Sequence, residues 1–264
     1  MNDEALRQST ALVRSRDPDR YLADLLAPEE ARPHLLVLHG FAVEVAEIRG
    51  KVSQPTLGEI RLKWWEQAIR GDHGGNPLAA ALAGTIARFH LPLAAFDNLL
   101  GARVFDLYDD PMPSLNDLEG YAGDTESALM QLGAMILAGG RDPGTATVAG
   151  FAGVAVAVTR LLRALPRNAG EGQSYLPADL LAANGGAEAG VMVIVAGVEA
   201  EFVHDEIALR LAARDADDAA ADALRDLADH RAHRARGGGD AHRLARFRLA
   251  DTHQAPVGGE PPHT

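Results

Sequence analysis

Acidic side chains at helical spacing are the groups in this 264-residue chain that could bind a metal ion. Glu44 and Glu47 would lie on one face of a helix, because residues three apart are neighbours there. Together with Asp106 they could form one magnesium site, since magnesium prefers oxygen ligands. Asp106, Asp109 and Asp110 also cluster, but two prolines follow them directly. Short acidic patterns match by chance often, so a solvated helix end is the favoured interpretation of that cluster.

Histidines offer weaker metal-binding patterns. Glu201 and His204 have the Glu-x-x-His spacing of helical di-iron proteins, which need two such pairs and two further glutamates. The sequence has no second copy that could lie on a helix. His230 and His233 could share a helix face, but they lie in a polar, Arg-rich stretch, so they are interpreted as solvated. The chain has no cysteine, so it can form neither a disulfide nor a thiolate metal site.

The segment 159–177, TRLLRALPRNAGEGQSYLP, resembles the second motif of the squalene/phytoene synthase family, T-N-x-L-R-D-x-x-E-D-x-x-x-G-R-x-Y-L-P. The family's two metal-binding aspartates fall on Ala164 and Asn168. Alanine offers no oxygen, and asparagine offers only a neutral carbonyl in place of a charged ligand. The positions that match are Thr159, Leu162, Arg163, Gly172, Tyr175, Leu176 and Pro177. For Arg163, Gly172 and Tyr175 a structural role is favoured: Gly172 permits a turn, and Tyr175 to Pro177 can fix the start of the next helix.

The segment 38–50, LHGFAVEVAEIRG, resembles the family's first motif, which reads D-D-x-x-D. Phe41 matches, whereas the three aspartate positions are occupied by Ala46, Glu47 and Gly50. The family's tyrosine and arginine that hold pyrophosphate fall on His39 and Val43. Upstream, the segment 15–21 places acidic groups where the family binds an anion. The resemblance therefore implies a chain with no catalytic residues and no metal site.

The segment 32–65 is similar to one branch of the family, which includes an assembly factor of respiratory complex I. The run GEIRLKWW carries much of this resemblance, which extends over about residues 12–185. It implies a non-catalytic assembly factor that needs no cofactor and contacts complex I subunits or subassemblies. An isoprenoid or lipid could still occupy an apolar cavity. The alternative is an active head-to-head prenyltransferase, with magnesium held by Glu44, Glu47 and Asp106.

Composition and periodicity predict an all-α fold. Apolar residues make up 47% of the chain and recur every three or four positions, with no alternating strand pattern. The resemblance implies a single-domain, isoprenoid-synthase-type helical bundle around a central cavity. We expect this domain over residues 1–236 and a poorly ordered, atypical tail over 237–264. The helices are expected near residues 38–48, 60–68, 82–89, 99–107, 114–138, 145–165 and 177–183. In the second of these, Ile60, Trp64 and Ala68 recur at helical spacing. Either one of Trp64 and Trp65 lies in the core and the other at an edge, or both pack in the core. Ser114 is expected to cap the fifth helix and Gly139 to end it.

Charge and hydropathy limit the remaining possibilities. The formal net charge of -12 argues against nucleic-acid binding, which requires a basic face. We find no apolar run long enough to span a membrane and no secretory signal. We therefore expect a cytoplasmic protein, with peripheral contact at the inner membrane left open.

Overall fold

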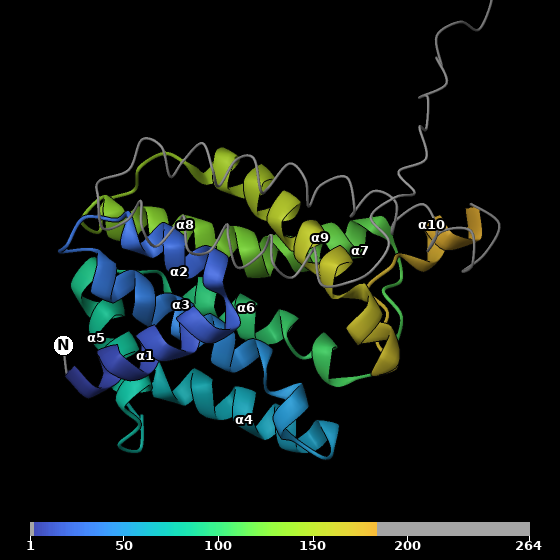
Figure 1. Ribbon diagram of the computed structural model, residues 1–264, viewed down its shortest axis with the longest axis horizontal. Helices are drawn as coiled ribbons and strands as arrows, with labels where there is room; N and C mark the ends of the chain where they lie inside the picture. Colours follow the sequence, from blue (N-terminus) through green and yellow to red (C-terminus); the bar gives the residue numbers. More distant parts are fainter. Residues whose placement is uncertain (1–2, 184–264) are drawn as a thin grey trace, which may run out of the picture.

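The computed structural model describes residues 3–183, and over that range the chain forms helices without strands (Figure 1). The all-α prediction is confirmed. The α-helices are α1 Asp3–Arg16, α2 Pro18–Leu25, α3 Arg32–Ala46, α4 Pro55–Ala68, α5 Pro77–Phe89, α6 Leu93–Ala102, α7 Leu115–Ala122, α8 Ala128–Leu137, α9 Ala146–Gly170 and α10 Ala178–Ala183. Two 3₁₀ turns, Arg49–Lys51 and Phe105–Leu107, and a π-helical turn, Gly123–Ser127, connect them. The predicted boundary at residue 236 and the Glu201, His204, His230 and His233 patterns lie outside the described residues.

Proline and capping residues set the helix starts. Proline occupies the first turn of α2, α3, α4 and α5, where its missing N–H has no helical partner to lose. Asn76 caps α5, accepting a hydrogen bond from the Ala79 N–H at 3.0 Å. Ser114 caps α7 as predicted, accepting from the Asp117 N–H at 3.2 Å. The helix predicted over 114–138 is α7 and α8 joined through the π-helical turn.

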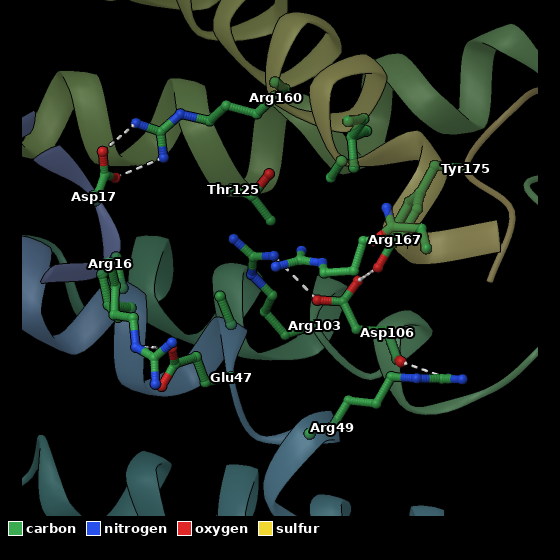
Figure 2. A pocket seen from close by; sticks show the side chains of 18 of the residues that line it. Arg16, Asp17, Glu47, Arg49, Arg103, Asp106, Thr125, Arg160, Arg167 and Tyr175 are labelled. Atoms are coloured by element: carbon green, nitrogen blue, oxygen red, sulfur yellow. Dashed lines mark hydrogen bonds and ion pairs between the residues drawn. The ribbon is translucent and has the colours of Figure 1, made fainter. Parts of the chain in front are cut away.

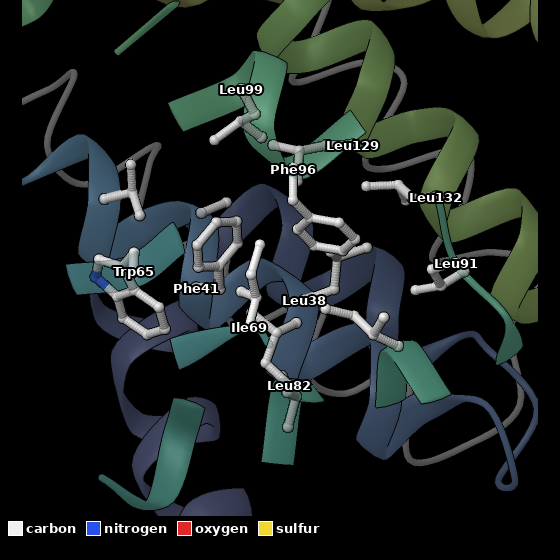
Figure 3. Packing of buried hydrophobic residues seen from close by; sticks show 14 of the residues in the cluster. Leu38, Phe41, Trp65, Ile69, Leu82, Leu91, Phe96, Leu99, Leu129 and Leu132 are labelled. Carbon is white, nitrogen blue, oxygen red and sulfur yellow. The ribbon is translucent and has the colours of Figure 1, made fainter. Parts of the chain in front are cut away.

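Helix α3 lies in the middle of the bundle and contacts α1, α2, α5 and α8. Its Phe41 is fully buried and packs edge-on against Trp65, with ring centroids 5.1 Å apart, and against Phe96 (Figure 3). Trp64 is only partly buried at the edge of this core, so of the two alternatives for the tryptophans the structure has one in the core and one at its edge. Ile60, which recurs with Trp64 and Ala68 at helical spacing, is 64% exposed, because α4 contacts the bundle along its other side.

Helix α9 runs further than the predicted 145–165, continuing through Pro166 to Gly170. It packs against α7, α8 and the π-helical turn, and Gly153 allows the close contact with Ser127. By length and composition α9 could cross a membrane, which corrects the expectation that no such segment exists. One such helix is weak evidence for a span, since core helices of soluble proteins meet the same criteria.

A candidate binding cavity crossed by ion pairs

A cavity of about 660 Å³ opens between α1, α3 and α9 (Figure 2). The end of α1 and start of α2 form one wall, with Ser15, Arg16, Asp17 and Arg20. The second half of α3 and the following turn form another. Helix α9 and the segment that follows it contribute a third wall. Arg103 after α6, Asp106 in the second 3₁₀ turn, Tyr121 of α7 and the π-helical turn form the remainder. The two segments that resemble family motifs therefore face the same cavity.

Six of the seven predicted motif positions that differ from the family line this cavity. They are Val43, Ala46, Glu47, Gly50, Ala164 and Asn168. His39 does not line it. Its Nδ1 lies 2.8 Å from Oδ2 of buried Asp24, so His39 belongs to a polar contact between α3 and α2.

The motif positions that match the family lie in different parts of the structure. Phe41 belongs to the core. Gly172 adopts φ +77°, a conformation that favours glycine, in the turn after α9, as predicted. Pro177 directly precedes α10, also as predicted. Arg163 is partly buried and does not line the cavity, and its Nη1 lies 3.4 Å from Oδ2 of Asp19 in α2.

Asp17 anchors the first group of ion pairs. Arg160 of α9 holds it with two hydrogen bonds of 2.6 and 2.8 Å, a bidentate geometry typical of strong arginine–carboxylate pairs (Figure 2). Arg20 lies 3.5 Å from the same carboxylate and also pairs with Glu126 of the π-helical turn. Burial opposes ionisation of Asp17, but Arg160 and Arg20 outweigh it and lower the pKa of Asp17. This group is therefore charged at neutral pH and electrically compensated.

Asp106 anchors the second group. It is buried, which corrects its interpretation as part of a solvated helix end. The hydroxyls of Tyr121 and Tyr175 donate to Oδ1 at 2.8 and 2.6 Å, and Arg103 donates to Oδ2 at 3.0 Å. Burial, reinforced by the nearby Asp106 carboxylate, raises the pKa of both tyrosines. Both tyrosines therefore stay protonated as donors. Asp109, by contrast, is exposed and pairs with Arg49 at 2.5 Å.

The third group lies at the exposed end of α3. Nε of Arg16 is 2.9 Å from Glu47, and Nζ of Lys51 is 2.9 Å from Glu44 and 3.2 Å from Glu47. Glu44 and Glu47 thus share one group through Lys51, whereas Asp106 pairs with Arg103 in another. Within residues 3–183, no group of three histidine or acidic side chains is placed to hold a metal ion. The magnesium site of the alternative interpretation is not assembled among these residues.

Arg20, Arg103, Glu126 and Arg160 were missed by sequence reasoning. Arg20 and Glu126 are 106 residues apart in the chain, and Asp17 and Arg160 are 143 apart. No short motif joins them, so spacing carried no signal. The expected apolar lining is also corrected. Ala42, Val43, Ala157, Leu161 and Ala164 form an apolar strip, but seven cationic and five acidic side chains share the walls.

The helical bundle has the fold of solved isoprenoid synthases. The squalene synthase HpnC from Alicyclobacillus acidocaldarius superposes with a TM-score of 0.61 at 20% identity, covering 89% of this chain and 94% of that one. A dehydrosqualene synthase superposes with a TM-score of 0.58 at 19% identity, covering 70% and 65%. At these identities the similarity shows the fold.

The chain belongs to the squalene/phytoene synthase family, whose model matches residues 13–243. Among curated proteins it is 31% identical over 183 residues to complex I assembly factor 6 from Bos taurus and 30% identical over 178 residues to the human protein. These matches cover 68% and 66% of this chain but only 55% and 53% of the relatives, so the chain spans about half of their length. Phytoene synthase 3 from Zea mays is 28% identical over 182 residues, 65% of this chain and 42% of that protein.

Proposed function

We propose that this chain is a non-catalytic member of its family that assists the assembly of respiratory complex I. Similarity to complex I assembly factor 6 from several animals supports an assembly role. Subunits or subassemblies of complex I are the proposed partners. A cytoplasmic location, with peripheral contact at the inner face of a respiratory membrane, is proposed with it.

The pairing of the cavity carboxylates is the observation that carries the non-catalytic part. Asp17, Glu47, Asp106 and Glu126 each contact an arginine or lysine. Ionising a prenyl diphosphate requires carboxylates that are free to hold magnesium against the leaving pyrophosphate. Here magnesium would have to displace a guanidinium from each carboxylate and leave that cation unpaired, which is costly inside a protein. Ala46 and Ala164 offer no replacement oxygen from α3 or α9.

The cavity favours a ligand that carries an acidic group. Seven cationic side chains face five acidic ones in its walls, although the chain as a whole carries a net charge of -12. The apolar strip between α3 and α9 could contact a short hydrocarbon portion of an isoprenoid or lipid. Inorganic pyrophosphate, with and without magnesium, is the simplest probe of the charged part.

Two measurements test the proposal. The purified chain is incubated with magnesium and farnesyl or geranylgeranyl diphosphate, and diphosphate release is followed. We expect no turnover, whereas a rate of about 1 per second, ordinary for an enzyme, would establish the prenyltransferase alternative. Deleting the gene in its host should then lower the amount of assembled complex I and leave squalene and carotenoids unchanged. Normal complex I in the deletion strain would refute the assembly role.

A further inference from the structure

Helix α4 exposes an apolar stripe that the packing of the bundle does not use. Leu57 is 44% exposed and Ile60 is 64% exposed, while Trp64 is partly buried beside them. With Arg61, these residues occupy positions i, i+3, i+4 and i+7, so they form one face of the helix. We call Leu57, Ile60, Arg61 and Trp64 the α4 stripe.

The side of α4 that faces the bundle is packed against neighbouring elements. Leu62 and Trp65 are buried in the core, and a side chain on Gly58 would meet Cδ2 of Leu107 at 2.5 Å. Helix α4 contacts α5, α6 and the 3₁₀ turn that contains Leu107, and it forms the lower edge of the bundle in Figure 1. Within the described part of the chain, the stripe borders this packed side and faces outward.

The charge of Arg61 limits which kind of protein surface can cover the α4 stripe. It is exposed, and among residues 3–183 it has no ion-pair partner. The neighbouring carboxylates are engaged elsewhere, since Glu59 accepts from the Tyr108 hydroxyl and Glu66 pairs with Lys63. A surface that covers Ile60 and Trp64 would also remove water from Arg61. A carboxylate in that surface would compensate this guanidinium, because arginine pairs with carboxylates through a matched fork of donors.

We infer that the α4 stripe is a docking surface for an amphipathic segment of a partner protein that presents apolar side chains and an aspartate or glutamate. Helical anchors spaced i, i+3, i+4 and i+7 are a common recognition mode, and tryptophan and arginine are common energetic centres of interfaces. A second copy docking through the same stripe would offer no carboxylate to Arg61, because the stripe contains none, so a partner of different sequence fits better. The partner's identity as a complex I subunit rests on the proposed function; the surface itself does not.

The test uses the full chain in its respiring host, with a photo-crosslinking amino acid at exposed Gln67, one turn beyond Trp64. We expect a crosslink to a segment rich in apolar residues that also contains an acidic residue. Ile60→Asp and Arg61→Glu should each lower the crosslink yield by roughly tenfold, the scale expected for an interface centre. Arg61→Lys should lower it less. Leu26→Asp, at a residue 57% exposed after α2, is the matched control and should leave the yield unchanged.

The outcomes separate this inference from the proposed function. Crosslinks confined to residues 184–264 of the same chain, to a second copy or to lipid would overturn the docking surface, as would yields insensitive to Ile60→Asp. Melting temperatures of the variants close to that of the unaltered chain show that lost crosslinking is not lost folding. A partner of the expected chemistry outside complex I would support the surface and refute the proposed partner. Loss of complex I in the deletion strain without any crosslink at Gln67 would support the proposed function and refute the docking surface.

Discussion

Two glycines of α9, Gly153 and Gly150, provide a sharp test of how this helix is held against the bundle. A Cβ on Gly153 would lie 2.3 Å from Cα and 2.4 Å from the backbone nitrogen of Ser127 in the π-helical turn. A Cβ on Gly150, one turn earlier on the same helix, would meet nothing within 4 Å. The substitutions Gly153→Ala and Gly150→Ala therefore differ mainly in this one contact.

The magnitude follows from two opposing terms. Alanine in place of a helical glycine stabilises by about 1 kcal/mol, and both variants gain this. Carbon atoms pack at about 3.5–4.0 Å, so Gly153→Ala forces α9 away from Ser127 by more than about 1 Å. Overpacking of this kind costs about 1–3 kcal/mol and more when backbone must move. We expect Gly153→Ala to lower the free energy of unfolding by about 2 kcal/mol and Gly150→Ala to raise it by up to about 1 kcal/mol.

Thermal and urea unfolding of the full chain measure the difference. At about 2–4 °C per kcal/mol for a domain of this size, the two melting temperatures should differ by about 6–12 °C. Because Ser127 neighbours Glu126, the retreat of α9 should also weaken the Arg160 contacts with Asp17 and Glu126. Equal melting temperatures for the two variants would show that α9 does not approach the π-helical turn as the structure has it.

Three further predictions concern the charged cavity. Tyr175→Phe removes one hydroxyl donor from Asp106. It should lower the free energy of unfolding by about 1.5–3 kcal/mol, the range for hydrogen bonds to charged groups. A change below about 0.5 kcal/mol in urea unfolding would contradict this prediction. The lowered pKa of Asp17 contributes stability above the unfolded aspartate pKa of about 3.9, which is lost as pH falls through the folded pKa. Asp17→Asn should therefore lower the melting temperature at pH 7, because the broken pair with Arg160 costs about 3 kcal/mol. Near pH 2 the substitution should have little effect. A loss of stability that does not shrink with falling pH would refute this. Removing divalent metal with EDTA should leave the melting temperature unchanged, and a clear fall would reveal a structural metal site.

The resemblance of the two motif segments to the family placed the cavity walls on the right helices. Six of the seven motif positions that differ from the family line one cavity, because α3 and α9 face each other in this fold. Helical periodicity predicted helices from α3 onward but not α1 and α2, and Ser114 and Gly139 marked two of the ends. The burial of each side chain could not be predicted in the same way. Ile60 shares helical spacing with Trp64 and Ala68, yet it is exposed whereas Ala68 is buried.

Residue types and their order in the chain determined the helical class, the family and the absence of aspartates at Ala46 and Ala164. Which charges meet was decided only by tertiary structure. Asp17 and Arg160 form a bidentate pair across 143 residues of chain, and Asp106 is buried among Arg103 and two tyrosines rather than solvated. Periodicity reports which face of a helix is apolar, but long-range ion pairs depend on how helices pack. The cavity's charged character is therefore a property of the packed bundle, since neighbours in the sequence do not create it.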